Sequence, residues 1–231
     1  GLNIVGNVTK SAVATGAELV SYEGSSNNYL RQPHNSDLDV IGNGTEHPYT
    51  MMGWFKSKNA DSYLSGQGVL LSANVHTDQF ISWQFNGADG SVGVWVKNTT
   101  GNSQYTTADV VLKNQWNHVV WGKFVGEVDL SADKFPTSIT NREFVICRSN
   151  SNIQTLVKFS LTNPTAEQIA KIYRDEKPLF QEGAKCTLHG NSDDINGLSY
   201  DDDTGITHAG TPNANGTGGI SEFTGLQRTG I

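Results

Sequence analysis

The sequence predicts an all-β protein built as a sandwich or jelly roll, and three observations carry that prediction. Hydrophobic residues make up only 36% of the 231 positions and charged residues only 17%, while glycine alone occupies 25. Residues that favour long helices are not abundant, which argues against a helix bundle or a coiled coil. Short segments of alternating apolar and polar residues recur through the middle of the chain, separated by turn-forming Gly, Asn and Asp.

The clearest strand patterns lie between residues 49 and 161. The segment Phe80–Phe85 alternates, and the loop Asn86–Gly90 then leads into a return strand. Because alternate side chains point to opposite faces, the return strand buries Val94 on one face and turns Trp95 to the other. The expected strands are Tyr49–Lys56, Gly68–Ala73, Phe80–Phe85, Val92–Lys97, Trp116–Phe124, Glu143–Cys147 and Ile153–Leu161.

One short helix is expected over residues 164–177. Thr165 and Gln168 fit a capping box, in which each side chain covers a free backbone N–H group of the other residue. A start with Pro164 as the first helical residue is the alternative. An apolar stripe at helical spacing follows, and Lys177–Pro178 ends the helix.

The chain is expected to have three parts. Residues 1–28 form an extended segment with one or two strands, residues 29–181 form the sandwich together with its helix, and residues 182–231 form a C-terminal β-hairpin extension. In this extension, residues 195–209 indicate strand, turn and strand, and residues 220–230 indicate a last strand. The extension has too little apolar content to fold alone, so we expect it to pack on the sandwich or on another copy of itself.

Two strands carry a family resemblance. Tyr49–Lys56 resembles the aromatic-T-x-x-x-W-[VF]-K strand of laminin-G/pentraxin-like domains, and Gln115–Val120 resembles their W-x-H-V-V strand. The resemblance covers roughly residues 29–161 and implies a concanavalin-A-like/laminin-G jelly-roll sandwich with one short helix and a C-terminal β extension. The Y-V-D-G turn of that family is not clear here, so its calcium-binding positions cannot be transferred to this chain.

The rest of the chain resembles a block found after such sandwiches in tailed-phage fibre proteins, many of them from marine phages. The matching segments are residues 164–182, 199–211 and 223–228. This resemblance implies a tail-fibre or appendage domain located on the virion, with other virion proteins as partners. Fibres of this kind are usually homotrimers, and the chain, which begins at Gly1, would then be a piece of a longer protein.

Several functional classes are disfavoured by the sequence. The net charge is −7 and no Lys/Arg cluster is present, so no nucleic-acid partner is expected. No apolar run approaches the roughly 18 residues of a membrane span, so no membrane insertion is expected. Cys147 and Cys186 are interpreted as two buried thiols, and a disulfide between them is left open.

Catalysis is not expected either. Glu127 and Asp129 match the acidic strand of glucanases only in part, because Ser131 and Ala132 stand where the acid/base carboxyl would be. No histidine pairing, G-x-S-x-G elbow or phosphate-binding loop is present. We therefore expect a protein that is not an enzyme and has no cofactor, with a glycan-degrading hydrolase as the least favoured alternative.

Aromatic rings on solvent-facing surfaces indicate sugar binding more clearly than any motif indicates catalysis, because they offer a flat apolar face to a sugar ring. Two candidates, Tyr63 and Tyr105, are expected in loops, and Trp95 on the outer face of its strand. The candidate ligand-binding residues are Tyr63, His76, Asp78, Trp95 and Tyr105. Asp201 and Asp203 are the candidate ligands for a calcium ion, and a plain hairpin turn is the alternative interpretation of that segment.

These expectations combine into one functional hypothesis. The chain is predicted to be a non-catalytic phage surface domain that binds the polysaccharide of a host cell. Each site would be weak, and a trimer would multiply the affinity through avidity. A structural virion decoration or fibre spacer without a ligand is the alternative.

Overall fold

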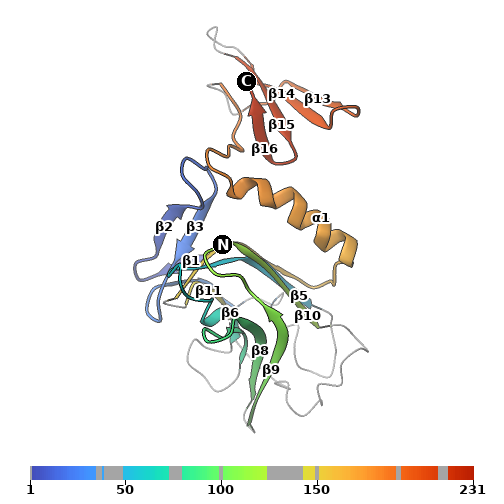
Figure 1. Ribbon diagram of the computed structural model, residues 1–231. Helices are drawn as coiled ribbons and strands as arrows, with labels where there is room; N and C mark the ends of the chain where they lie inside the picture. The colour runs from blue at the N-terminus through green and yellow to red at the C-terminus, as the bar shows by residue number, and fades with distance from the viewer. Residues whose placement is uncertain are drawn as a thin grey trace. The chain divides into compact units, whose positions relative to one another are not determined.

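The strands pair into three sheets, and one α-helix and one short 3₁₀-helix complete the secondary structure that the computed structural model describes (Figure 1). The chain divides into two units, residues 1–10 with 21–164 and residues 11–20 with 165–231, which we call the first and the second unit. The domain boundaries predicted at residues 28 and 181 stay predictions. The structure describes residues 2–34, 38, 49–72, 80–98, 101–123, 143–148, 151–190, 194–212 and 218–231.

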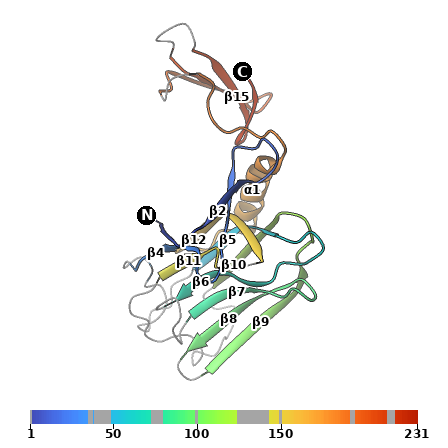
Figure 2. The same ribbon diagram turned by 90° about the vertical axis from the view of Figure 1, so that its left-hand side faces the viewer.

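The first unit holds a seven-stranded sheet in the order β1-β4-β11-β6-β7-β8-β9, in which β7, β8 and β9 run side by side (Figure 2). Its strands are β1 (Asn3–Val5), β4 (Tyr29–Gln32), β11 (Glu143–Ile146), β6 (Gly66–Ser72), β7 (Phe80–Phe85), β8 (Ser91–Asn98) and β9 (Gly101–Val110). A second sheet has five strands in the order β10-β5-β12-β3-β2. Its strands are β10 (Asn117–Lys123), β5 (Tyr49–Ser57), β12 (Asn152–Ser160), β3 (Val20–Glu23) and β2 (Thr9–Ala12).

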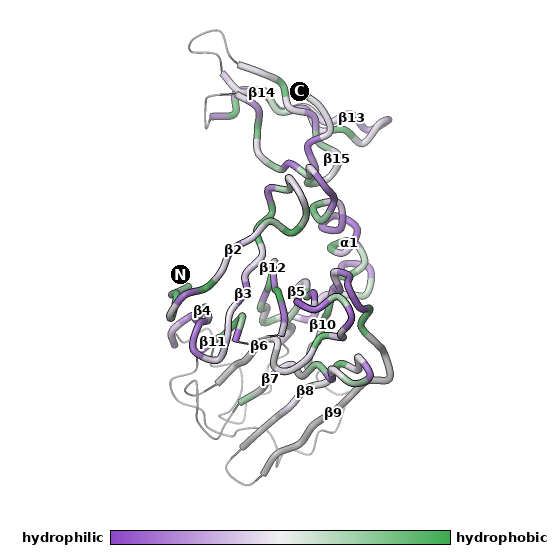
Figure 3. The backbone as a smooth tube through the Cα atoms, turned by 60° about the vertical axis from the view of Figure 1, so that its left-hand side comes forward, coloured by the Kyte–Doolittle hydropathy of each residue, from purple (hydrophilic) through white to green (hydrophobic). Residues whose placement is uncertain are grey.

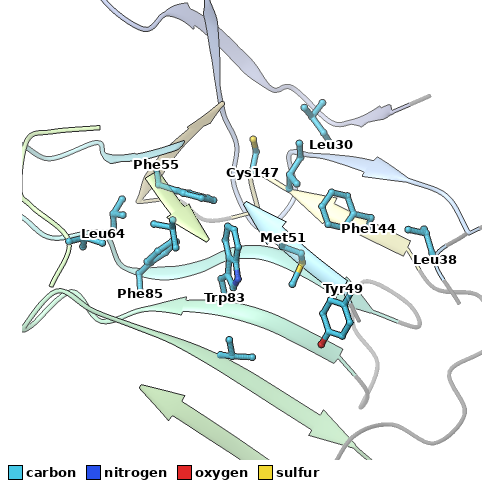
Figure 4. Close-up of a cluster of buried hydrophobic side chains, with 14 residues drawn as sticks. Leu30, Leu38, Tyr49, Met51, Phe55, Leu64, Trp83, Phe85, Phe144 and Cys147 are labelled. Carbon is cyan, nitrogen blue, oxygen red and sulfur yellow. The ribbon is translucent and has the colours of Figure 1, made fainter. Parts of the chain in front are cut away.

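The hydrophobic core lies between these two sheets and combines aromatic, aliphatic and sulfur-containing side chains (Figure 4). The period-2 alternation of the strands produces it, because Trp83 and Phe85 of β7 and Val94 of β8 all point inward, as predicted. The ring of Phe55 packs edge-on against Trp83, with ring centroids 5.1 Å apart. Along the chain, hydrophobic stretches are interrupted at short intervals by hydrophilic ones, which is typical of strands with one buried face (Figure 3).

Two buried amides of β12 join the five-stranded sheet to the seven-stranded one. Gln154 donates from Nε2 to the carbonyl of Gly68 at 2.9 Å and accepts at Oε1 from the N–H of Cys147 at 3.2 Å. Asn152 donates from Nδ2 to the carbonyl of Ser65 at 2.8 Å and accepts at Oδ1 from the N–H of the same residue at 3.2 Å. Both amides have no exposed surface, so these hydrogen bonds satisfy backbone groups that water cannot reach.

A β-bulge interrupts β12 directly after these amides. The pairing with β5 shifts register between Thr155 and Lys158, so that Leu156 and Val157 together oppose Gly53. Leu156 has a φ of 48°, a left-handed conformation that costs a residue with a Cβ atom of order 1–3 kcal/mol. A Cβ atom on Gly53 would lie 3.1 Å from Cγ2 of Val157, which explains why glycine occupies the middle of an otherwise bulky strand.

Several sequence predictions need correction. Residues 101–110 form β9, so Tyr105 lies in a strand and not in a loop. The sequence there is polar and lacks an alternating apolar pattern, and it is a strand because its backbone pairs with β8 at the edge of the sheet. Residues 1–28 supply three strands rather than one or two, and residues 220–230 form a hairpin of two strands, β15 (Ile220–Thr224) and β16 (Gln227–Gly230), rather than a single strand.

The second unit contains the helix and a four-stranded sheet in the order β13-β14-β15-β16, with β13 at Gly197–Asp201 and β14 at Ile206–Gly210. Helix α1 spans Ala166–Glu176 and is followed by the 3₁₀-helix Lys177–Phe180. The predicted capping box is confirmed: Gln168 N–H donates to Thr165 Oγ1 at 3.2 Å, and Thr165 N–H donates to Gln168 Oε1 at 2.8 Å. Within the described part of the chain, no helix is long and apolar enough to cross a membrane.

A carboxylate ties the loop 11–20 to the segment after the helices. Glu18 accepts hydrogen bonds from the N–H groups of Cys186 and Thr187, each at 2.8 Å, and from the Thr187 hydroxyl at 2.7 Å. Burial opposes the charge on Glu18, but these hydrogen bonds outweigh it and lower the pKa of its carboxyl to about 2. These partners are 168 and 169 residues away in sequence, so the contact cannot be predicted from patterns of neighbouring residues.

The inter-sheet amides generate a stability prediction. Replacing Gln154 by Met keeps the side-chain volume but leaves the Cys147 N–H and the Gly68 carbonyl without partners, which we expect to cost about 2–4 kcal/mol of unfolding free energy. Urea unfolding measures this cost. Gln115→Met, at an exposed loop position, is the matched control and should change stability by less than about 0.5 kcal/mol. Equal stability of the two variants would contradict the role assigned to Gln154.

Glu18 generates a pH prediction. Its folded pKa of about 2 lies below the ordinary value of 4.5, so its stabilising effect is fully present above pH 4.5 and is lost as the pH falls toward 2. In the wild type, the amide hydrogens of Cys186 and Thr187 should therefore lose protection against exchange over this pH range. Glu18→Gln should show low protection already at about pH 6, whereas Glu182→Gln, at an exposed position of the same unit, should behave like the wild type. Unchanged protection in Glu18→Gln would refute the proposed tie.

Candidate functional site

An aromatic pair lies on the outer face of the seven-stranded sheet, the face that turns away from the core. Trp95 of β8 stands opposite Ser82 of β7 and Gln104 of β9 in the strand register. Its ring contacts Phe80 edge-on, with ring centroids 4.9 Å apart and an interplanar angle of 88°. Trp95 is half-buried, and the prediction that it faces away from Val94 is confirmed. Such an amphipathic ring, held rigid by its neighbour, can stack on the apolar face of a sugar.

The outer face continues toward β1 as a small apolar cluster. Phe80 also packs on Tyr29 and on Val145, which are 8% and 0% exposed. Val145 stands opposite Arg31 in register, and Arg31 donates to the carboxylate of Glu143 at 3.1 Å. Residues paired in an antiparallel register share one face of the sheet, so this ion pair lies on the same outer face as the aromatic cluster. Sequence analysis missed Phe80 and this ion pair, although the alternation within β7 was enough to place Phe80 outside.

Tyr63 lies elsewhere in the first unit. It belongs to the loop between β5 and β6, as predicted, and its half-buried ring packs against the core. Lys113 Nζ lies 4.5 Å from the centre of the ring, within the range of a cation–π interaction. The core and Lys113 therefore both contact the Tyr63 ring.

The remaining candidates for ligand binding are only partly covered by the structure. The backbone of Tyr105 lies opposite Val94, which places it on the strand next to that of Trp95. His76 and Asp78 lie outside the described residues, as do Glu127 and Asp129. The proposed grouping of these residues therefore stays a prediction.

The candidate calcium ligands lie at the tip of the β13–β14 hairpin. The Asp201 carboxylate accepts from the Thr204 hydroxyl at 2.7 Å and from the Asp203 N–H at 2.9 Å. These hydrogen bonds hold the pKa of Asp201 below its ordinary value, and they match the geometry of a turn. Among the described residues, no group of three or more His, Cys, Asp or Glu side chains could hold a metal ion. Calcium binding by Asp201 and Asp203 stays a prediction.

The two cysteines are both free thiols. Cys147 is buried, and burial raises its pKa to about 12. Cys186 is exposed, so the prediction of two buried thiols is wrong for this residue. Burial and the nearby Glu18 carboxylate both raise the pKa of Cys186. Neither thiol is therefore activated as a nucleophile at neutral pH.

The comparisons with known proteins rest on structure, because no family model and no curated protein matches the sequence. The binding domain of botulinum neurotoxin serotype G is similar, with a TM-score of 0.53 and 10% identity over 98% of this chain and 61% of that one. The binding domain of botulinum neurotoxin DC is also similar. Its complex with SialylT has a TM-score of 0.53 at 10% identity, and its complex with rat synaptotagmin II has 0.50 at 12%, each over 97% of this chain and 57% of that one.

These similarities establish the fold and no more. The chain is an all-β sandwich protein with one short helix, as predicted, and it spans about three fifths of the length of the structures it matches. At 10–12% identity, no residue role can be transferred from one chain to the other. The resemblances to laminin-G domains and to phage fibre proteins stay predictions.

Proposed function

We propose that this chain is a non-catalytic binding domain that recognises glycans through the outer face of its seven-stranded sheet. The observation that carries the proposal is the half-buried Trp95, which stands edge-on to Phe80 on the face opposite the core. Solved structures that share the fold are binding domains, and one of them was determined in complex with SialylT. This similarity supports a binding role without naming the ligand.

The described carboxyl groups whose pKa is shifted hold loops and turns, whereas Glu127 and Asp129, the two weighed for glycoside hydrolysis, lie outside the described residues. A glycosidase needs a general acid whose pKa is raised, so that it stays protonated near neutral pH. The described carboxyl groups with a shifted pKa, which are Glu18, Asp89 and Asp201, are all shifted downward by hydrogen bonds. They serve as hydrogen-bond acceptors for loops and turns, which is a structural task.

We place this binding role on a virion, in a tail fibre or surface appendage that attaches to host-cell polysaccharide. The support is the resemblance of residues 164–182, 199–211 and 223–228 to phage fibre proteins. In the structure, these segments contain the capped helix α1, most of the β13–β14 hairpin and the β15–β16 turn, all of which belong to the second unit. A fibre spacer without a ligand is the second candidate function, because the same segments would serve either role.

We propose a homotrimer as the assembly for this role, with other virion proteins as neighbours. Large apolar side chains in the second unit support it. Leu198 and Tyr200 of the edge strand β13 are 72% and 62% exposed. An unpaired edge strand with exposed apolar side chains readily pairs with another chain.

Light scattering tests the assembly. We expect a mass of about 75 kDa, three times the 25.0 kDa of the chain. The double change Leu198→Lys with Tyr200→Lys should lower the mass to that of a monomer, because buried lysines would repel one another in the interface. Leu112→Lys, at a position 57% exposed in the first unit, should leave the trimer intact. A wild-type mass near 25.0 kDa would contradict the trimer.

A glycan array followed by calorimetry tests the binding function. We expect Trp95→Ala to weaken binding of the selected glycan at least tenfold, because the stacking surface is removed. Trp116→Ala, at another half-buried tryptophan, is the control and should retain affinity if it remains folded by circular dichroism. Titration with a calcium chelator reports whether Asp201 and Asp203 contribute. Glycan binding that survives Trp95→Ala would refute the site, and no binding to any glycan would favour the spacer.

A further inference from the structure

A cavity of about 360 Å³ lies within the first unit, beside β1 and the bulge of β12. This volume falls within the range of small-molecule sites, which is roughly 300–1,000 Å³. Aliphatic side chains in or next to four strands form most of its wall, namely Leu2, Ile4, Leu30, Ile146, Leu156 and Val157. No residue of the aromatic pair on the outer face takes part, so the cavity is separate from the proposed glycan site.

The wall of the cavity depends on the bulge in β12. Leu156 lines the cavity in its left-handed conformation, with a φ of 48°. Strained residues of this kind concentrate at ligand sites, because the surrounding structure must hold them in place. At the mouth, Leu2 and Ile4 leave 50% and 58% of their surface exposed, although strand β1 presents Ile4 toward the buried Leu30 in register. The cavity therefore has unfilled apolar surface both inside and at its entrance.

The polar groups of the cavity determine what it can accept. Gln154 uses both ends of its amide for the Gly68 carbonyl and the Cys147 N–H, so it offers little to a ligand rich in hydroxyls. Lys10 is the cation of the lining, and its Nζ lies 5.8 Å from the ring centre of Tyr22. Among the described residues that line the cavity there is no carboxylate. Tyr22 and Thr155 are the other polar residues of the lining. Each sugar hydroxyl buried there would need a hydrogen-bond partner, whereas an alkyl chain would need none.

We propose that this cavity binds a free single-chain anionic amphiphile, such as a fatty acid. The alkyl chain lies between the aliphatic walls, where it removes apolar surface from water. The carboxylate head lies at the mouth, where the Lys10 ammonium neutralises its charge. The bulge at Leu156 shapes the wall against which the chain packs.

Calorimetry with dodecanoate, below the concentration at which it forms micelles, tests the proposal on the full chain. We expect one site per chain, and we expect dodecyltrimethylammonium, which has the same alkyl chain and the opposite charge, to bind at least tenfold more weakly. Lys10→Gln should weaken dodecanoate binding about tenfold, as expected for the loss of a charge-assisted contact. Lys113→Gln is the matched control, because that lysine also lies over a tyrosine ring and should leave binding unchanged.

A second variant separates ligand binding from folding. Ile4→Trp places a large side chain at an exposed position of the mouth, so it should block dodecanoate while leaving the unfolding temperature of the empty protein unchanged. Saturating dodecanoate should raise the unfolding temperature of the wild type but not of this variant. The proposal is overturned if the wild type binds no dodecanoate, if Ile4→Trp binds it normally, or if only anionic lipid vesicles are bound.

Discussion

The sandwich depends on two buried amide side chains that cross from one sheet to the backbone of the other. Asn152 and Gln154 project from the same face of β12, two residues apart, and each forms two hydrogen bonds to main-chain groups on the far side. Packing of the aromatic and aliphatic core buries apolar surface, but the hydrophobic effect is non-directional. The amides are directional, and leaving any of their partners unpaired in the core is costly, so they set the register of one sheet against the other.

The same strand links that constraint to the cavity. After Gln154, the bulge adds one extra residue to β12. The strand then resumes its pairing with β5 at Lys158, which lies opposite Met52. Gly53 permits it, because a side chain there would press on Val157. The bulge leaves Leu156 in a strained conformation on the cavity wall. The bulge that follows the inter-sheet amides thus also shapes the wall of the cavity for which we propose an aliphatic anionic ligand.

The outer face follows from the same alternation that fills the core. Once Val94 is buried against Trp83, the neighbouring Trp95 must emerge on the opposite side of the sheet, where Phe80 is the aromatic residue that meets it. The two proposed sites are therefore independent in their residues but share one scaffold. One offers the half-buried ring of Trp95 and suits a sugar, and the other offers a largely aliphatic wall and suits an alkyl chain.

The sequence by itself determined the features that depend on neighbours along the chain. Period-2 alternation located β7 and β8, and the spacing of Thr165 and Gln168 located the helix start, because their hydrogen bonds join residues three positions apart. Only the tertiary structure decided the contacts of Gln154 with Gly68 and of Glu18 with Thr187, which join residues 86 and 169 positions apart. It also decided that the polar segment 101–110 is a strand, since β8 supplies its hydrogen bonds. Alternation and capping are local, whereas a buried amide finds its partner only once the sheets have met.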